Sequence, residues 1–282
     1  MSTDVPEYLQ VEADELGRGS GVTLRIVTDM AAIAHEMAAA MAQVIWQMQR
    51  EGRGATLIIP VGPVDQYPVF AELVNREGMS LADTVFINMD EYLTDDDEWI
   101  PEDHPLSFRG YMNRKFYDLL DPKLAPPPEH RVFPDPRDPE GIGRLIGERG
   151  GVDVCFGGIG INGHIAFNEP PEPGESITDE EFANLPTRVL SLSRETRTIN
   201  SVTVGGEISV IPRRCITVGM RDILAARSLR FYCNRPWQSG VIRRVLHGPI
   251  GAACPASFLR THPDASITVA EYVAAKPDIR LR

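Results

Sequence analysis

The stretch VDVCFGGIGINGHIAFNEP, residues 152–170, decides the fold class of this 282-residue chain. It opens with the short apolar run Val152–Gly158, which lacks a regular polar alternation and is therefore typical of a strand covered on both faces. A glycine-rich loop that carries His164 and Glu169 follows directly. A buried strand that ends in such a loop indicates a parallel sheet whose ligand binds beyond the carboxyl ends of the strands.

Strand-like runs of the same kind recur along the chain, and helical patterns separate them. The run TLRIVT at 23–28 is followed by apolar residues at three- and four-residue steps, which predict a helix with one face packed in the core. These residues are Met30, Ile33, Met37, Met41, Val44 and Met48. The other strand-like runs are 55–60, 84–89, 215–219 and 229–233, and the other helical patterns are 107–120 and 139–149. This alternation predicts a doubly wound α/β fold, a mostly parallel sheet with helices on both faces.

Composition argues against two classes of partner. The chain has 28 Lys and Arg against 40 Asp and Glu, a net charge of -12 that repels nucleic acid and anionic membranes. No uncharged apolar run is long enough to span a bilayer, and the acidic N-terminus does not resemble a secretion signal. We therefore expect a cytoplasmic protein with no nucleic-acid or membrane partner. The length and the 43% hydrophobic content predict a single domain, residues 1–282.

Three further features have a structural interpretation beside a functional one. The four cysteines form no Cys-x-x-Cys pair, so we expect reduced thiols, three of them in the core, and no zinc or redox site. They are Cys155, Cys215, Cys233 and Cys254. The acidic segment 170–185, which contains Pro and Gly, is either a lid, within the wider range 170–210, or a plain surface loop. The acidic run Asp95–Glu98 indicates solvated surface, with a metal site as the minority interpretation.

Two loops after strand-like runs carry candidate catalytic residues. Asp90 and Glu91 follow the run 84–89, where an α/β site would use a carboxylate as a general base, although Asp in such a place often only caps the next element. His164 and Glu169 share the glycine-rich loop, and a carboxylate beside a histidine fixes its tautomer and stabilises its charged form. The alternative is a structural histidine bonded to backbone carbonyls. The glycine-rich context at a strand end favours proton transfer.

At these residues the sequence resembles the glucosamine-6-phosphate deaminase family. The motifs that carry the resemblance are NMDEY (88–92), HPxS (104–107), GGIGINGHIAFNEP (157–170), ETRTINS (195–201) and IPRRCITVG (211–219). The resemblance covers most of the chain, from about the first helix to the end. The sister family with the same fold, 6-phosphogluconolactonase, continues its Gly-His with Thr-Ala-Ser, whereas Ile165, Ala166 and Phe167 follow here. This difference favours the deaminase branch.

The resemblance implies a Rossmann-like sheet with a lid, no metal or organic cofactor, and a homo-oligomer, often a hexamer, that binds a small sugar. It also implies aldose-to-ketose isomerisation coupled to loss of ammonia. Under the resemblance, Asp90 is the base that moves the C2 proton to C1 through an enediol-type intermediate. His164 is the acid/base of ring opening, and Glu169 is its carboxylate partner. The same loops supply candidate substrate-binding residues, which are Gly62, Glu91, Gly160 and Gly163.

The contacts that hold the sugar phosphate in this family are largely absent. In the phosphate loop, Pro63 lacks an N–H donor, Val64 lacks a hydroxyl, and Asp65 adds a negative charge where a dianion would bind. The two cationic positions of the family fall on Val202 and Gln238. Each lost charge-assisted contact is worth roughly 1.5 to 3 kcal/mol, so a phosphorylated sugar would bind much more weakly.

Several arginines are candidates to replace the missing cations, and Asn162 is a further departure from the family pattern. Arg221 is the first candidate for a replacement cation, and Gln238 is kept as a substrate-binding candidate. Arg235, Arg243 and Arg244 are further candidates, although arginines on a helix surface are more often solvated or paired with carboxylates. Asn162, counted here as a catalytic candidate, stands where the resemblance implies an aspartate, and an amide cannot exchange a proton.

Three functions stay open on this evidence. The first is an isomerase/deaminase for an amino sugar or related aldose, phosphorylated by family resemblance but unphosphorylated or altered by these departures. The second is a non-catalytic sugar-binding relative, which Asn162 favours. The third is a lactonase-like hydrolase in which His164 activates water, and the presence of Asp90 argues against it.

Overall fold

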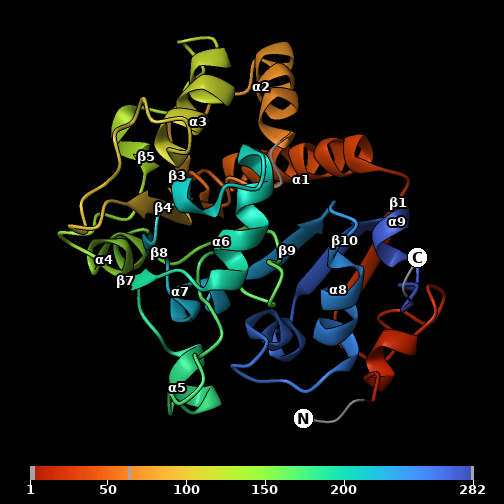
Figure 1. Ribbon diagram of the computed structural model, residues 1–282. Coiled ribbons are helices and arrows are strands. Elements are labelled where there is room, and N and C mark those ends of the chain that lie inside the picture. Colours follow the sequence, from red (N-terminus) through yellow and green to blue (C-terminus); the bar gives the residue numbers. More distant parts are fainter. Residues whose placement is uncertain (1–3, 63–64, 281–282) are drawn as a thin grey trace.

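Seven parallel strands form the centre of the molecule (Figure 1). The computed structural model describes residues 4–62 and 65–280, so the departures noted at Pro63 and Val64 lie outside the described residues. The strand order is β1 (Thr23–Val27), β10 (Ala265–Ala270), β9 (Ser228–Cys233), β6 (Val154–Gly157), β2 (Thr56–Ile59), β3 (Val85–Asn88), β5 (Arg131–Val132). Every neighbouring pair in this sheet is parallel. Helices surround the sheet, so the predicted Rossmann-like α/β fold is confirmed.

The first long helix, α1 (Met30–Arg50), packs against β9 and β10. It begins at Asp29, whose side chain accepts a hydrogen bond from the backbone N–H of Ala32. The predicted apolar stripe is wrong at its first residue, because Met30 is 40% exposed in the first turn, and Val44 is only partly buried. The alanines of the helix and Ile45 complete the buried face.

A second sheet holds three antiparallel strands, β4 (Asp90–Leu93), β8 (Arg214–Thr217) and β7 (Arg188–Ser191), in that order. The expectation that the run 215–219 belongs to the parallel sheet is therefore wrong. Cys215 and Ile216 are fully buried because this small sheet has its own apolar cluster, which includes Tyr92 and Phe167. An apolar run without alternation indicates that both faces of a strand are buried. It does not indicate whether the neighbouring strands are parallel or antiparallel.

The remaining helices cover the sheets and their loops. They are α2 (Gln66–Glu77), α3 (Phe108–Lys115), α4 (Gly141–Glu148), α5 (Asp179–Ala183), α6 (Arg194–Ser201), α7 (Met220–Leu224), α8 (Gln238–His247) and α9 (Glu271–Ala274). Six 3-10 turns are η1 (Glu7–Gln10), η2 (Tyr117–Leu119), η3 (Pro128–His130), η4 (Val202–Val204), η5 (Ile208–Val210) and η6 (Pro255–Thr261). The helix predicted over 107–120 ends early, since α3 stops at Lys115 and η2 follows. None of the described helices is long and apolar enough to cross a bilayer.

The segment 170–185 is attached to the body of the protein. Within α5, Phe182 is buried and stacks on Phe258 with ring centroids 6.3 Å apart. The carboxylate of Asp179 accepts a hydrogen bond of 2.7 Å from the backbone N–H of Ala252. Asp179 and Phe182 therefore hold α5 against the rest of the protein.

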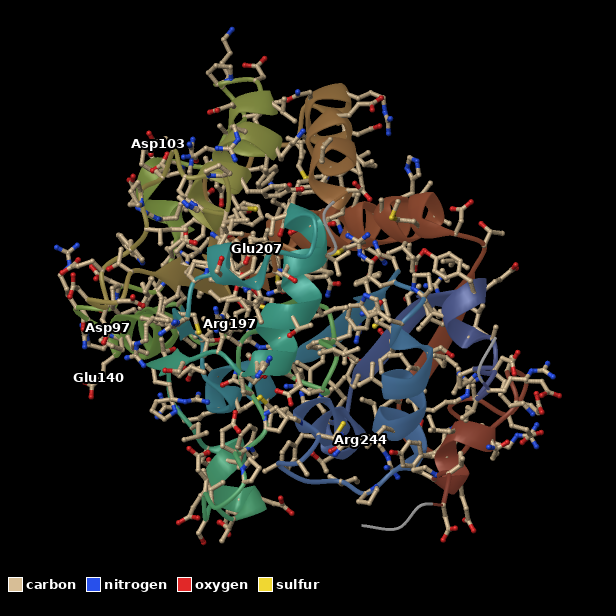
Figure 2. The ribbon with its side chains drawn as sticks, viewed as in Figure 1. Asp97, Asp103, Glu140, Arg197, Glu207 and Arg244 are labelled. Carbon is tan, nitrogen blue, oxygen red and sulfur yellow. The ribbon has the colours of Figure 1, made fainter. Side chains whose placement is uncertain are left out.

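The structure also describes the surroundings of the four cysteines and of the acidic run 95–98. All four cysteines are buried and carry free thiols. In the acidic run 95–98, Asp97 lies at the outer edge of the molecule (Figure 2) and accepts hydrogen bonds of 2.6 and 2.9 Å from Arg214. Within the residues described, no group of three His, Cys, Asp or Glu side chains could hold a metal ion.

Candidate active site

A cavity of about 340 Å³ lies at the carboxyl ends of β9, β6, β2 and β3. This is where ligands bind in open parallel sheets, and the volume lies at the lower end of the range for small-molecule sites, roughly 300 to 1,000 Å³. Five of the predicted site residues line it, and these are Gly62, Asp90, Gly160, His164 and Gln238. The two candidate proton-transfer groups, Asp90 and His164, therefore face one space.

Asp90 lies where the chain leaves the central sheet for the second sheet. Only Met89 separates it from β3, and it is the first residue of β4. Its side chain is 7% exposed and makes no hydrogen bond within the described part of the chain. Burial raises the pKa of Asp90 well above its usual range, and the negative charge of Glu91 raises it further. An unpaired, buried carboxylate at a cavity wall is suited to accept a proton from a bound ligand.

Glu91 points away from the cavity, contrary to the expectation that it binds substrate. It is fully buried, and its carboxylate accepts hydrogen bonds from the backbone N–H groups of Tyr92, Phe108 and Arg109 at 2.8, 3.0 and 2.9 Å. The hydroxyl of Ser107 donates a further bond of 3.0 Å. Glu91 thus holds the start of α3, where unpaired N–H groups favour an anion.

His164 is held at its Nδ1 atom by three neighbours. This atom lies 2.8 Å from Oδ1 of Asn162, 3.1 Å from Oγ1 of Thr196 and 3.4 Å from a carboxylate oxygen of Glu169. Because Oδ1 of Asn162 can only accept, Nδ1 must carry the proton in this arrangement. The Nε2 atom is left with its lone pair beside Gly160, and both residues line the cavity. His164 can therefore take a proton from a ligand.

Glu169 and Asn162 act on the cavity through His164, since neither lines it. Burial alone would raise the pKa of Glu169, but hydrogen bonding to His164, the charge of that histidine, and bonds from Asn162 and Thr196 outweigh it and hold the pKa at about 2. The amide nitrogen of Asn162 donates a bond of 2.7 Å to Glu169. Asn162 therefore joins the carboxylate to the histidine through one side chain.

Two glycines make room for this arrangement, as expected for a loop close to a ligand. A Cβ atom on Gly160 would lie 2.0 Å from Nε2 of His164, so no larger residue leaves the ring where it is. Gly163 has φ +91° and a Cβ there would lie 2.5 Å from Sγ of Cys254. Gly163 shapes the loop but is not among the cavity-lining residues.

Gln238 and Val202, the two positions where the resemblance implies cations, offer little to an anion. Gln238 is buried, and both polar groups of its side chain are used internally: Oε1 accepts from the N–H of Arg235 at 2.7 Å, and Nε2 donates to the carbonyl of Ile159 at 2.8 Å. Val202 is 69% exposed and does not line the cavity. Gln238 thus serves as a brace between the loops after β6 and β9.

Of the arginines considered as replacement cations, Arg235 alone reaches this cavity. Arg221 lies 3.2 Å from the carboxylate of Asp222 and is not brought to the site. Arg243 is fully buried and bonds to the carbonyls of Val11, Ser239 and Ala274, which makes it a structural residue. Arg244, labelled in Figure 2, donates to the carbonyl of Ala253 and also lies outside the cavity.

Sequence reasoning missed several residues that shape the site. Thr196 is fully buried and touches Nδ1 of His164, and Asn200 lines the cavity and donates 2.9 Å to the hydroxyl of Tyr92. Both belong to the motif ETRTINS, so the resemblance contained them without assigning them a role. Asn234 and Trp237 also line the cavity. The spacing of these residues in the sequence does not indicate a role in the site. Only the order of the strands shows that they lie at the cavity.

Comparisons with known proteins agree with this geometry. No protein-family model matches the chain. Glucosamine-6-phosphate deaminase of Streptomyces coelicolor is 31% identical over 255 residues, which cover 89% of this chain and 91% of the relative. The enzyme of the same name from Corynebacterium kroppenstedtii is 33% identical over 227 residues, 78% of this chain and 81% of the relative.

Solved structures share the fold. A monomeric glucosamine-6-phosphate deaminase superposes with a TM-score of 0.76 at 24% identity, over 90% of this chain and 99% of that one. The 6-phosphogluconolactonase of Thermotoga maritima superposes with a TM-score of 0.64 at 15% identity, over 89% of this chain and 100% of that one. With a parallel sheet, a cavity at its carboxyl edge and sequence relatives that match over most of their length, the chain belongs to the glucosamine-6-phosphate deaminase family.

Proposed function

We propose that this chain is an amino-sugar isomerase/deaminase that converts a 2-amino aldose and water into a ketose and ammonia. The observation that supports it most directly is the unpaired carboxylate of Asp90, which lines the same cavity as His164. Burial and the neighbouring charge raise the pKa of Asp90, and a carboxylate with a raised pKa is a stronger base for a C–H proton.

In this proposal Asp90 moves one proton between two carbons. It removes the proton from C2 of the open-chain aldose and returns it to C1 through an enediol-type intermediate, in which the amino group replaces one hydroxyl. C2 becomes an iminium carbon as C1 is reduced, so no external oxidant is required. Water then adds to C2, and ammonia leaves. The raised pKa of Asp90 also allows its protonated form to persist until C1 takes the proton.

His164 opens the sugar ring in the same scheme. Its Nε2 lone pair takes the proton of the C1 hydroxyl and delivers it to the ring oxygen, which separates the two ends of the hemiacetal. The positive charge that forms on the imidazole is stabilised by Glu169, 3.4 Å from Nδ1. Glu169 stays ionised for this purpose, because its pKa is held at about 2.

We infer that the substrate carries no phosphate. Gln238 is neutral and is bonded to Arg235 and Ile159, Val202 supplies no polar group, and Asp65 adds a negative charge that acts on Tyr111 in the cavity wall. A dianion would meet this repulsion with Arg235 as the one Lys or Arg among the described residues that line the cavity. The single domain and the homo-oligomer stay predictions.

The cover of the cavity is the remaining part of this proposal. Asn200 in α6 and Thr203 in η4 line the cavity, and Figure 1 shows α6 near the middle of the view, between the second sheet and α8. We therefore propose α6 and η4 as the lid within the expected range 170–210, because Asp179 and Phe182 hold the segment 170–185 to the body of the protein.

The test measures ammonia release and the exchange of the C2 proton for deuterium in D2O, with glucosamine and glucosamine 6-phosphate in parallel. We expect activity on the sugar without phosphate and its loss in Asp90→Asn. Asp97→Asn, at the outer edge of the molecule, is the matched control and keeps activity. If neither sugar exchanges its C2 proton, the proposal is wrong.

Asn162 favours one competing function, a sugar-binding relative without turnover. Its side chain takes the place of an ionisable group two residues before His164, and its amide nitrogen donates one hydrogen bond to Glu169. Sugar binding by calorimetry without C2 exchange would support that function. Rapid hydrolysis of a sugar lactone in the same series would instead support a lactonase.

A further inference from the structure

Arg235 is the one Lys or Arg side chain among the described residues that line the cavity. Its guanidinium makes no hydrogen bond or ion pair in the described part of the chain, while its backbone N–H is held by Gln238 at 2.7 Å. The residue is exposed and is one of the cavity-lining residues, and its charge also acts on Tyr272 outside the cavity. Because its backbone is fixed and its guanidinium is unpaired, Arg235 is suited to bind an anionic group of a ligand.

Asn234 offers a second unpaired group beside it. Its side chain is 5% exposed, lines the cavity and has no hydrogen bond within the described residues, although its backbone carbonyl accepts 2.6 Å from the hydroxyl of Tyr272. Its amide therefore has both donor and acceptor groups left for a ligand. Both side chains face the same cavity from adjacent positions.

These two residues lie three strands away from Asp90, whereas the loop of His164 follows β6, the neighbour of β9. They follow β9, whereas Asp90 follows β3, and β6 and β2 lie between these strands. Three strand spacings of about 4.8 Å separate the strands by roughly 14 Å, which two side chains and a hexose fill together. A sugar with C2 at Asp90 therefore directs its C6 end toward Arg235.

The charge at that end fits a monoanion better than a dianion. One guanidinium is present there. The planar fork of arginine matches a carboxylate with two parallel hydrogen bonds. The amide of Asn234 can donate to the same oxygens. A phosphate dianion would need further cations, and the described cavity wall supplies none.

We propose that the cavity binds a 2-amino sugar whose C6 is a carboxylate, an amino-uronic acid, and that Arg235 and Asn234 hold this carboxylate. The proposal rests on the function proposed above for the same site. It adds the chemical class of the substituent and the residues that select it. Arg235 is a specificity residue in this scheme, because it contacts the substrate away from the reacting carbons.

The experiment compares 2-amino-2-deoxyglucuronate, glucosamine and glucosamine 6-phosphate in the C2 exchange and ammonia assays. We expect the highest kcat/KM for the carboxylate sugar. In Arg235→Gln its KM should rise roughly 10- to 100-fold, as for loss of a hydrogen bond to a charged group, with little change for glucosamine. Arg235→Lys should restore part of this loss. Arg213→Gln, which removes an exposed arginine outside the cavity, is the control and leaves all three sugars unchanged.

The outcomes separate this inference from the function on which it rests. Equal kcat/KM for glucosamine and the carboxylate sugar, with no effect of Arg235→Gln, overturns the inference and leaves the deaminase proposal standing. A preference for glucosamine 6-phosphate that Arg235→Gln abolishes also overturns it, since the arginine then holds phosphate. If no sugar turns over, calorimetric binding of 2-amino-2-deoxyglucuronate to the wild type and Arg235→Gln decides: tenfold weaker binding to the variant supports the inference, and equal or absent binding refutes it.

Discussion

Oδ1 of Asn162 lies 2.8 Å from Nδ1 of His164, so a neutral amide holds the histidine where the family resemblance implies a carboxylate. The amide fixes the tautomer as well as an aspartate would, but it supplies no charge. The negative charge comes from Glu169, which is 3.4 Å from Nδ1 and is bonded to the other end of the same amide. Of the two carboxylates that the resemblance implies beside His164, one is replaced by an amide, and the charge that stabilises a protonated His164 comes from Glu169.

Asn162→Asp should destabilise the protein at neutral pH. The substitution replaces a hydrogen bond of 2.7 Å to Glu169 by two carboxylates at the same separation. Two carboxylates that share a site cannot both ionise freely, so one pKa of the pair rises and folding loses stability wherever both would be charged. We expect a loss of about 1–3 kcal/mol at pH 8 and a smaller one at pH 4, measured by urea unfolding. Asn162→Ala removes the bond without adding charge, and because that bond helps lower the pKa of Glu169, its loss should also be larger at pH 8 than at pH 4 but smaller than that of Asn162→Asp.

Gly160→Ala should abolish activity while the protein stays folded. The new Cβ would lie 2.0 Å from Nε2 of His164, so the ring has to rotate away from the cavity. The activity loss should exceed 100-fold, roughly the contribution of a positioned acid/base group. Gly147→Ala is the matched control, because a Cβ on this glycine of α4 has nothing within 4 Å. That variant should be fully active, and more stable by roughly 0.5–1 kcal/mol. Full activity of Gly160→Ala would show that the ring position does not matter.

Glu169→Gln should lose stability in a defined pH window. The pKa of Glu169 is lowered in the folded protein to about 2, below the value of about 4.3 for a free glutamate. A lowered carboxyl pKa stabilises the folded state above the unfolded pKa, and this contribution disappears as pH falls through the folded pKa. The free energy of unfolding of the variant should fall below that of the wild type by up to about 3 kcal/mol at pH 7.

Unfolding measured at several pH values tests this window. The difference between wild type and Glu169→Gln should shrink below pH 4.3 and vanish near pH 2. Glu140→Gln changes a carboxylate whose side chain is 89% exposed, and its difference from the wild type should stay flat. If the difference in unfolding free energy between the wild type and Glu169→Gln stays constant down to pH 2, the ionised carboxylate of Glu169 is not the group that His164 and Asn162 stabilise.

The local patterns of the sequence were enough for the fold class but not for the sheet partners. Strand-like runs and helix stripes predict the parallel sheet, and β8 is misassigned because burial of Cys215 on both faces does not reveal an antiparallel neighbour. In the site, Asp90 and His164 were predicted because each follows a strand. Glu91 was misplaced because adjacent residues of a strand point to opposite faces, so only one of the pair reaches the cavity. Asn234 and Arg235 required the position of β9 in the sheet.

Asp90→Asn should make the protein more stable as well as inactive. Burial raises the pKa of Asp90 and the charge of Glu91 adds to it, so the ionised carboxylate is less favourable in the folded than in the unfolded protein. A carboxyl whose folded pKa is raised destabilises the fold once pH exceeds the unfolded pKa, and it does so most above the folded pKa. An asparagine of the same shape removes this penalty, and Tm should rise at pH 8, where each kcal/mol corresponds to roughly 2–4 °C.

The pH dependence of this gain separates electrostatics from packing. At pH 4 the wild-type carboxyl is protonated in the folded protein and close to half protonated in the unfolded one, so the gain of Asp90→Asn should nearly disappear. Asp65→Asn, at an exposed carboxylate near the same cavity, is the control and should leave Tm nearly unchanged at both pH values. A lower Tm for Asp90→Asn at pH 8 would mean that the carboxylate has a stabilising partner. A higher Tm together with lost C2 exchange would mean that the fold tolerates an unfavourable buried charge because the reaction needs the base.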